Sequence, residues 1–365
     1  MHVLITNFHP GDGGGHTTYI QSLVLAKNSS VNYTVAAPAT SKLAKVCSHN
    51  GVDVIPIDFP GKFKEWKDVK RSVERTINLL KSRQFDLVHV NGSPDHKIIV
   101  LSIIFGKLPY RPKILFTKHN SFRVKKDLWS KIKHRHFCDG VIVVCKKLKL
   151  EYENLLKDDR IFFVENGVDT FIYAPSSKSR KAELRRRFGL EPDQIMLVSC
   201  SGTAEHKGWQ LIANVVSGQK NLLVVPLGSE PSDGLLLKLF PSGLPSNLKF
   251  VGHQEDVRPF LHMADVGFVL STSVETISFA CREMMACGLP VIVSDYGCLQ
   301  ENVTESTGWV THAGSEQSIA IAVDSILKAD LSKMGTAARL RAVENFGLDQ
   351  FLERTSSVYF KVCGF

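Results

Sequence analysis

Short apolar runs alternate with longer amphipathic segments along most of this chain. The apolar runs have strand length and are predicted strands, whereas the segments between them have helical spacing. Strands that alternate with helices favour parallel sheets covered by helices on both faces, so the predicted class is α/β with doubly wound sheets. The main predicted strands cover residues 2–6, 33–37, 52–57, 86–90, 113–117, 140–145, 161–164, 195–200, 221–225, 249–251, 266–270 and 291–294.

The segment 264–294 has the clearest pattern. It predicts a strand, a polar turn, a helix through Met285, a Gly-Pro break and a second buried strand. Glu275 lies at the turn, and Glu283 lies eight residues further on, inside the helix. The backbone N–H groups of residues 276–280 would open that helix and direct its positive dipole towards an anion. The turn therefore predicts binding of a phosphorylated ligand with hydroxyl groups nearby.

Other polar loops follow predicted strands and so lie at the carboxyl edge of a parallel sheet, where open α/β sheets bind ligands. The loop 7–16 contains Gly13–Gly15, which allow a close backbone approach ahead of a helix predicted from Thr17 to Lys27. The loop 91–96 contains Asp95. The remaining loops contain His119, after the strand 113–117, and Lys207, after the strand 195–200.

Composition limits the class of protein. The 365 residues are enough for two α/β domains, and 44% hydrophobic with 22% charged residues is typical of a globular chain. No apolar run approaches the roughly 20 residues of a membrane span. The N-terminus has no export signal and is better interpreted as a first strand. The eight cysteines show neither a C-x-x-C pair nor zinc-ligand spacing, which predicts a cytoplasmic protein without a bound metal or cofactor.

The net charge of +9 is concentrated in one half of the chain. Residues 1–175 carry 27 Lys and Arg against 16 Asp and Glu, whereas residues 176–365 carry 18 against 20. The excess is densest in 62–71 and 122–135, which mix Trp or Phe with basic residues at helical spacing. Such helices either face solvent or lie on an anionic membrane surface. No nucleic-acid recognition motif accompanies the charge, so nucleic acid is not an expected partner.

The chain resembles the family 4 retaining glycosyltransferases. The resemblance rests on Glu275-x7-Glu283, followed by the sequence Met-Ala-Cys-Gly-Leu-Pro-Val-Ile, and on the Asn-Gly-Val-Asp turn at 166–169. It implies the GT-B fold, in which two Rossmann-like doubly wound domains face a cleft and a C-terminal helix crosses back to the first domain. The expected domains are 1–168 with the helix at about 346–365, and 169–345, with a linker at about 168–185.

The resemblance also implies roles for individual residues. Glu275 would contact sugar hydroxyls, Glu283 the ribose and Lys207 the diphosphate, while His119 would reach the transferred sugar. The expected catalytic residues are His119, Lys207 and Glu275. The expected donor-binding residues are Gly14, Gly15, Thr203, Lys207, His253, Ile277, Ser278, Phe279, Ala280 and Glu283, and the expected acceptor-binding residues are His16 and Asp95.

The sequence departs from the family pattern at two places. Gly202 stands where an arginine usually lies five residues before the lysine, so one of two expected cationic contacts to the diphosphate is missing. Either Ser201 and Thr203 replace it with neutral hydrogen bonds, or a residue elsewhere supplies the charge. The usual Glu-Gly-Phe-Gly sequence reads Glu-Thr-Ile-Ser at 275–278, which changes the backbone freedom beside the sugar pocket.

The expected function is retaining transfer of a sugar from a nucleotide diphosphate sugar, of the UDP or GDP type, to a glycan or lipid-linked acceptor in the synthesis of lipopolysaccharide or another cell-surface polysaccharide. There is no Asp-x-Asp motif, so transfer is expected to be metal-independent. The expected location is the cytoplasm, peripheral on the inner face of the plasma membrane. Two alternatives remain open: a GT-B sugar-nucleotide epimerase, and a catalytically weak partner subunit that binds nucleotide sugar.

Overall fold

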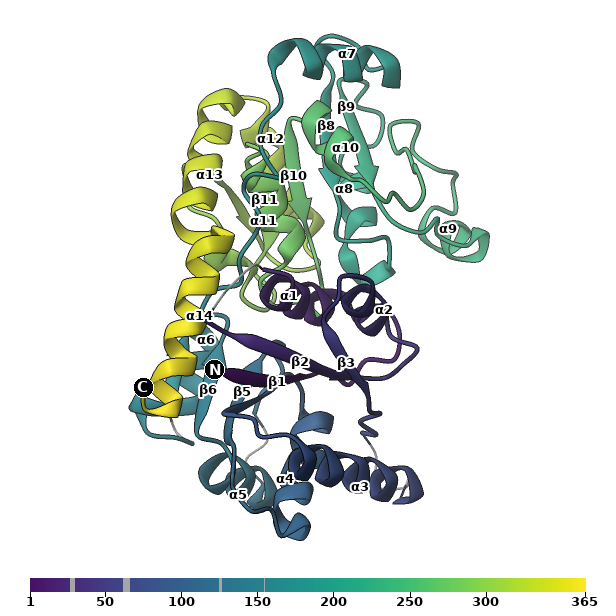
Figure 1. The fold of residues 1–365 in the computed structure, drawn as a ribbon. Helices are drawn as coiled ribbons and strands as arrows, with labels where there is room; N and C mark the ends of the chain where they lie inside the picture. Colours follow the sequence, from purple (N-terminus) through teal and green to yellow (C-terminus); the bar gives the residue numbers. More distant parts are fainter. Residues whose placement is uncertain (27–29, 62–65, 125–126, 154) are drawn as a thin grey trace. The chain divides into compact units, whose positions relative to one another are not determined.

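The computed structural model describes residues 1–26, 30–61, 66–124, 127–153 and 155–365. The chain forms two compact units (Figure 1). Unit 1 comprises Met1–Gly167 and Asp349–Phe365, and unit 2 comprises Val168–Leu348. Each unit has a parallel sheet with helices, so the predicted α/β class with doubly wound sheets is confirmed.

Unit 1 is built on a seven-stranded sheet of order β3-β2-β1-β4-β5-β6-β7, in which all neighbours pair in parallel. Its strands are β1 (His2–Thr6), β2 (Asn32–Ala37), β3 (Asp53–Pro56), β4 (Leu87–Val90), β5 (Lys113–Lys118), β6 (Gly140–Val143) and β7 (Ile161–Phe163). Its helices are α1 (Gly14–Val24), α2 (Lys42–His49), α3 (Trp66–Ser82), α4 (Ser93–Gly106), α5 (Leu128–His136), α6 (Lys146–Glu153) and α14 (Leu348–Cys363).

Helices cover both faces of the unit 1 sheet. Helices α1 and α2 lie on one face, and α3 and α4 lie on the other (Figure 1). This follows from the strand order, because the connections run outward from β1 in opposite directions and right-handed crossovers then place their helices on opposite faces. The residues of β1 from Val3 to Ile5 are fully buried between these layers.

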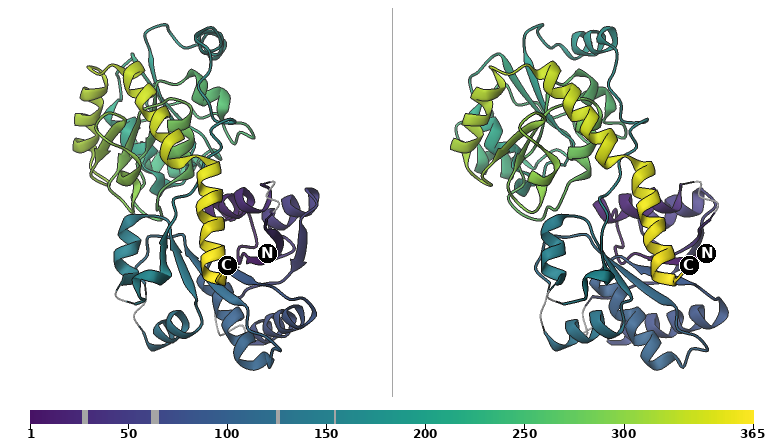
Figure 2. Two further views of the ribbon diagram at one scale, coloured as in Figure 1. Left: turned by 60° about the vertical axis from the view of Figure 1, so that its left-hand side comes forward. Right: turned by 90° about the vertical axis from the view of Figure 1, so that its left-hand side faces the viewer.

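The C-terminal helix α14 belongs to unit 1. Its Phe351 packs on Tyr19 of α1 with ring centroids 5.1 Å apart, and its Tyr359 hydroxyl lies 2.7 Å from Nδ1 of His89 in β4. At the end of the helix, the Cys363 thiol donates to the carbonyl oxygen of Asp86, whose carboxylate accepts from the backbone N–H of His2. Both ends of the chain therefore lie at one edge of this unit (Figure 2).

Unit 2 is built on a five-stranded parallel sheet of order β12-β11-β10-β8-β9. Its strands are β8 (Ile195–Ser199), β9 (Leu222–Pro226), β10 (Val266–Val269), β11 (Val291–Ser294) and β12 (Gly308–Thr311). Its helices are α7 (Lys178–Phe188), α8 (Trp209–Val215), α9 (Asp233–Leu239), α10 (Arg258–Met263), α11 (Phe279–Ala286), α12 (Glu316–Ile326) and α13 (Leu331–Phe346).

Alternate residues of the unit 2 strands belong to two separate hydrophobic cores, one on each face of the sheet. Leu222, Val224 and Ile292 pack with residues of α8 and α12, whereas Val291 and Val293 pack with residues of α11 and α13. Successive side chains of a strand point to opposite faces of the sheet. Strands buried on both faces therefore have continuous apolar sequences, which is why β8 to β11 were predictable from their composition.

Two predictions about unit 2 were wrong. No strand forms at 249–251; only an isolated parallel bridge joins Val224 and Leu248. The segment 168–185 is not simply a linker, because α7 begins at Lys178. In α7, Lys181 and Arg185 donate to the carboxylate of Asp265 at 2.7 and 2.8 Å. Helix α7 has no fully buried residue, and only Leu184 and Phe188 pack partly buried against the core, so its apolar pattern is too short to identify the helix.

Some predictions fall on residues outside the described part of the chain. These residues are Lys27, the last residue of the helix predicted from Thr17, and residues 62–65 and 125–126 of the two basic segments. The helix that was predicted from Thr17 is α1, and it begins at Gly14. Among the described residues, no helix is both long enough and apolar enough to cross a membrane.

Candidate active site

The loop between β10 and α11 holds Glu275 at the carboxyl edge of the unit 2 sheet. Its backbone has positive φ at two residues that are not glycine, Val274 (φ 52°) and Ser278 (φ 54°). Such conformations are costly for residues with a Cβ and concentrate at functional sites. Ser278 stands at the second glycine of the family's Glu-Gly-Phe-Gly pattern. Ser278 therefore has a positive φ, which favours glycine, although the glycine of that pattern is absent.

Lys207 and Glu275 form an ion pair in this loop region. Nζ of Lys207 lies 2.9 Å from Oε2 of Glu275, and the two side chains are only 18% and 13% exposed. Lys207 is brought there by Gly208, which has φ 76° and lies so close to β10 that a Cβ would be 2.1 Å from the carbonyl oxygen of Leu270. Two of the three predicted catalytic residues are therefore brought together within unit 2.

Helix α11 begins later than the sequence indicated. Its first residue is Phe279, and the side chain of Ser278 accepts a hydrogen bond from the backbone N–H of Cys281 at 3.4 Å. The N–H groups of Phe279 and Ala280 belong to the first helical turn, but residues 276–278 precede it. The N–H of Thr276 donates to Oε1 of Glu275 at 3.1 Å. The expectation that residues 276–278 form part of the helix was wrong, because the loop turns away at positive φ first.

The second glutamate, Glu283, lines a pocket within unit 2. The Cys200 thiol donates to its Oε2 at 3.8 Å, and the Tyr173 hydroxyl also hydrogen-bonds to it. Burial raises the pKa of Glu283 to about 7, and these two hydrogen bonds oppose that rise only in part. The pocket has a volume of about 370 Å³. Its lining comprises Ile172, Tyr173, Cys200, Glu255, Asp256, Val257, Arg258 and Glu283.

The loop that follows β8 holds Thr203 and Gly202. The Thr203 hydroxyl donates to the carbonyl oxygen of Ser229, and its own carbonyl oxygen accepts from Trp209 Nε1 at 2.9 Å. Gly202 has φ 93°, which an arginine would adopt only with strain. The missing arginine is therefore accompanied by a backbone that suits glycine. His253 is exposed, on the irregular segment after the bridge at Leu248.

A second cluster lies at the carboxyl edge of the unit 1 sheet, around His119. The Asn91 amide donates through Nδ2 to the carbonyl oxygens of Thr6 and His89, so its Oδ1 faces Nε2 of His119 at 2.8 Å. Since Oδ1 can only accept, His119 carries its proton on Nε2. Burial lowers the pKa of His119 well below its usual value, so the ring is neutral and its Nδ1 is an acceptor. This tautomer could accept a hydrogen bond from a sugar hydroxyl.

His16 is in contact with the same cluster. Its ring packs on that of His119 with centroids 4.4 Å apart, and its Nδ1 lies 2.8 Å from Nε2 of His9. Burial, with a smaller effect of His9, lowers the pKa of His16 to about 3. His9 and Asn91 were not predicted site residues, and only their positions in polar loops after strands could have indicated them. Gly14 and Gly15 open α1 directly before His16.

Asp95 lies beneath this edge and is fully buried. Its Oδ2 accepts from the Thr6 hydroxyl at 2.5 Å and from the backbone N–H of Asn91 at 2.8 Å. Burial raises the pKa of Asp95 to about 6, against the lowering effect of its hydrogen bonds. These contacts fix the loop that carries Asn91, and so the position of His119. The structure thus gives Asp95 a positioning role, whereas contact with an acceptor stays a prediction.

Solved structures share this arrangement of elements. The chain matches a glycosyltransferase from Rickettsia africae with a TM-score of 0.83 at 17% identity, over 99% of this chain and 98% of that one. It also matches HepE of Anabaena, solved with UDP and glucose, with a TM-score of 0.78 at 16% identity over 97% and 98% of the two chains. At these identities the likeness establishes the fold alone. That fold, with its two doubly wound units, is the GT-B class of glycosyltransferases.

Sequence families resolve the class further. The family Glycosyltransferase Family 4 matches residues 13–170, and the family Glycosyl transferases group 1 matches residues 180–341. The chain belongs to the family 4 glycosyltransferases.

Curated relatives are distant. Alpha-maltose-1-phosphate synthase of Mycobacterium tuberculosis is 25% identical, and the match covers 57% of this chain and 58% of that protein. The O-antigen biosynthesis glycosyltransferase WclY of Escherichia coli is 22% identical over 60% of this chain and 64% of its own length. The chain therefore spans less than two thirds of the length of these relatives.

Proposed function

We propose that this protein transfers a sugar, with retention of anomeric configuration, from a nucleoside diphosphate sugar to a glycan or lipid-linked acceptor. The observation that carries the proposal is the Lys207–Glu275 pair, with N–O distance 2.9 Å, in the loop region that leads into α11. A cation, helix N-terminal amides and a carboxylate are the groups needed by a leaving diphosphate and a sugar with hydroxyls.

The leaving group is the centre of the proposed mechanism. When the bond between the anomeric carbon and the donor phosphate breaks, negative charge grows on the diphosphate. The Lys207 ammonium and the free N–H groups of the first turn of α11, at Phe279 and Ala280, would stabilise this charge. The leaving phosphate oxygen would take the proton of the attacking acceptor hydroxyl, on the same face as the departing group. That geometry retains the configuration.

By the family pattern, Glu275 and the unit 1 cluster are the proposed sugar-binding groups. Glu275 would accept hydrogen bonds from sugar hydroxyls while its other interactions keep Lys207 in place. Neutral His119, with Nδ1 free to accept, would bind a further hydroxyl, and His16 beside it would contact the acceptor. We include Gly14, Gly15, Thr203 and His253 in the donor site by the family pattern, and Ile277 and Ser278 through the loop backbone.

The pocket of Glu283 suits the nucleoside. An ionised carboxylate can accept from both ribose hydroxyls, and Tyr173 offers an aromatic wall beside it. Arg258 lines the same pocket, where its guanidinium donates to Asp256 at 2.8 and 2.9 Å. Arg258 is our candidate for the charge that the missing arginine at Gly202 would otherwise supply. HepE, with the same fold, binds UDP, which supports a uridine donor as the first to test.

Transfer is proposed to be metal-independent, because the sequence has no Asp-x-Asp motif and Lys207 provides a cation at the diphosphate site. The acceptor is proposed to belong to lipopolysaccharide or another cell-surface polysaccharide, as the name of the O-antigen relative suggests. An acceptor of that kind is anchored in a membrane. We therefore place the enzyme in the cytoplasm, peripheral on the inner face of the plasma membrane.

A second candidate function has one observation in its favour. Gly202 leaves the diphosphate site with one cation fewer than the family pattern, so the chain could instead be a partner subunit that binds nucleotide sugar without efficient transfer. Thermal-shift screening with UDP, GDP and their sugars identifies the donor, and release of nucleoside diphosphate in the presence of membrane extract measures transfer. We expect stabilisation by one nucleotide and its release from the matching sugar. Binding without release would support the partner-subunit alternative, and no binding of any nucleotide would contradict both.

A further inference from the structure

A groove on unit 1, whose lining contains none of the candidate site residues described above, combines positive charge with an apolar lining. It lies between α5 and α6 and the segment that precedes α5, and has a volume of about 710 Å³. We call it the cationic groove. Its lining residues are Arg123, Val124, Lys131, Arg135, Lys147, Leu150, Glu151 and Leu155.

The lining follows from helical spacing. In α5, Lys131 and Arg135 are four residues apart and so lie on one face. In α6, Lys147 lies three and four residues before Leu150 and Glu151, which places these three on one face as well. Two helix faces that are basic and aliphatic therefore meet across the groove. The sequence left open whether the basic segment 122–135 faces solvent or a membrane. In the fold, its Lys131 and Arg135 line a groove together with residues of α6.

The charge of the groove is strongly positive. Arg123, Lys131, Arg135 and Lys147 contribute four cations, against the single carboxylate of Glu151. Oε2 of Glu151 accepts a hydrogen bond from the backbone N–H of Val124 at 3.0 Å. One carboxylate oxygen of Glu151 is therefore engaged with the backbone at Val124. Such a surface matches a ligand that carries several negative charges.

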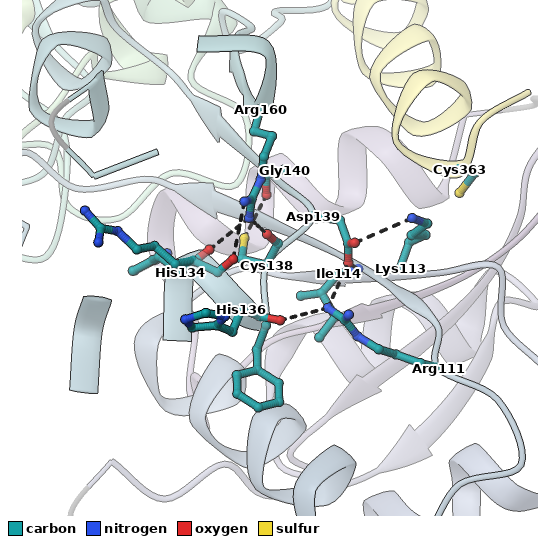
Figure 3. A network of polar contacts seen from close by, with 12 residues as sticks. Arg111, Lys113, Ile114, His134, His136, Cys138, Asp139, Gly140, Arg160 and Cys363 are labelled. Atoms are coloured by element: carbon teal, nitrogen blue, oxygen red, sulfur yellow. Dashed lines mark hydrogen bonds and ion pairs between the residues drawn. The ribbon is translucent and has the colours of Figure 1, made fainter. Parts of the chain in front are cut away.

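The groove is held in shape by hydrogen bonds beneath it. The Arg160 guanidinium donates to the carbonyl oxygens of His134 and Arg135 at 3.0 and 3.3 Å and to that of Cys138, at the end of α5 (Figure 3). Nε of Arg135 donates to the carbonyl oxygen of Leu155 at 3.3 Å, which links α5 to the segment after α6. The basic side chains of α5 therefore project from a fixed helix.

Large apolar side chains stand exposed next to these cations. Leu128 is 73% exposed and lies three residues before Lys131, so it shares the face of α5 that lines the groove. Leu150, in the lining itself, is 63% exposed. Exposed apolar groups beside a positive surface mark an interaction site. A purely polar polyanion such as nucleic acid would leave these side chains in water.

We propose that the cationic groove docks on an anionic phospholipid bilayer: its basic side chains bind lipid phosphates, and Leu128 and Leu150 enter the interfacial layer. A membrane surface satisfies both features at once, because its phosphates meet the cations and its acyl boundary accepts the aliphatic groups. The proposal deepens the membrane part of the proposed function and rests on that part. It does not depend on which donor or acceptor the enzyme uses.

Vesicle flotation tests the charge of the groove. The purified full chain is mixed with phosphatidylcholine vesicles, with or without 30 mol% phosphatidylglycerol, at low and high salt. The variant Lys131→Glu/Lys147→Glu alters one cation on each wall. Its matched control is Lys42→Glu/Lys45→Glu, two exposed lysines of α2 in the same unit with the same change in net charge.

We expect salt-sensitive binding of the unaltered protein to the anionic vesicles only. Each basic residue near an anionic surface contributes about 1 kcal/mol, so loss of two should weaken binding at least about 30-fold, while the control changes it by less than about threefold. Equal weakening by the control would reveal a diffuse charge effect and overturn the proposal, as would binding to neutral vesicles alone or no vesicle binding. Binding of an RNA oligonucleotide that is lost in the groove variant, without vesicle binding, would also overturn it.

A tryptophan in place of Leu128 tests the apolar part, in a Trp129→Phe background that removes the neighbouring tryptophan. Brominated phospholipids quench tryptophans that reach the interfacial layer, so the variant Leu128→Trp/Trp129→Phe should be quenched more strongly than Trp129→Phe alone. Equal quenching of these two proteins would place the contact elsewhere and contradict the proposal. Stabilisation by UDP or GDP, measured on every variant, should be unchanged. Nucleotide binding without vesicle binding would contradict only the membrane-docking proposal. Vesicle binding without nucleotide binding would contradict only the proposed transferase function.

Discussion

Nζ of Lys207 and Oε2 of Glu275, 68 residues apart in the chain, lie 2.9 Å from each other in unit 2. The pair holds the predicted diphosphate-binding cation against the predicted sugar-binding carboxylate. In such a pair, each charge reduces the cost of burying the other, so removing one partner leaves the second unbalanced. The ammonium would therefore meet the leaving diphosphate already positioned and partly desolvated.

Replacing Lys207 should nearly abolish transfer. We expect Lys207→Ala to lower kcat/KM at least about 100-fold, which corresponds to the roughly 3 kcal/mol that one preorganised group supplies to a transition state. Lys207→Arg keeps the charge but not its compact geometry, so it should retain part of the activity. Steady-state kinetics with the donor found by thermal shift measures both.

The exposed pair Lys238–Glu205, at 3.0 Å with side chains 65% and 47% exposed, provides the control. Lys238→Ala should alter neither rate nor melting temperature, because exposed pairs contribute little. An active Lys207→Ala variant that folds normally would remove Lys207 from the mechanism.

Glu283 should make the enzyme less stable as the pH rises towards neutrality. Its folded pKa of about 7 is above the usual value of a glutamate, so the folded state holds the proton more tightly than the unfolded chain. The resulting stabilisation is complete below about pH 4.5 and is lost as the pH rises through about 7. We expect Glu283→Gln to have a flatter stability profile. Thermal melts at pH 5 and pH 8 provide the comparison.

Donor binding should show the opposite pH trend, since the ribose hydroxyls need an ionised acceptor. Affinity for UDP or GDP should rise about tenfold from pH 6 to pH 8 in the unaltered protein and stay flat in Glu283→Gln. Calorimetric titration at both pH values measures this. Parallel pH curves for the two proteins would argue against a ribose contact by Glu283.

The loop that carries Glu275 is predicted to be strained. Val274 is β-branched, has φ 52° and is 59% exposed, so its side chain gains little packing in return for the unfavourable backbone. Val274→Gly should raise the free energy of unfolding by about 1 kcal/mol, after the entropic cost of glycine is included. Val274→Ala keeps a Cβ, so it should raise the free energy of unfolding much less than Val274→Gly. Melting curves of equal midpoint for the two variants would show that the backbone there is not strained.

Packing of α14 on the sheet of unit 1 should depend on the hydrogen bond between Tyr359 and His89. Both side chains are fully buried, and His89 Nε2 also lies 2.6 Å from the Thr117 hydroxyl. Tyr359→Phe would leave Nδ1 of His89 without its partner, at a cost of about 1–3 kcal/mol. Tyr110→Phe removes a more exposed hydroxyl and should cost less, because water replaces its partner. Urea or thermal unfolding of both variants tests the difference.

Much of the fold could be predicted because its strands are buried on both faces. Strands β1 and β11 have the predicted bounds, and Glu275 and Glu283 lie in the predicted loop and helix. The failures have a common cause. Helix α7 has only Leu184 and Phe188 packed against the core and is also held by ion pairs to Asp265. The predicted strand at 249–251 is replaced by an isolated bridge at Leu248. Periodicity detects neither kind of contact.

The sequence by itself determined the α/β class, the family, and the loops in which the candidate catalytic residues stand, because these depend on apolar period, glycine and charge along the chain. Only the tertiary structure decided that Lys207 meets Glu275, that Asp95 is buried beneath Asn91, and that two basic helices enclose a groove. Those are distances between segments far apart in sequence, set by how the helices pack on the sheets. No spacing along the chain encodes them directly.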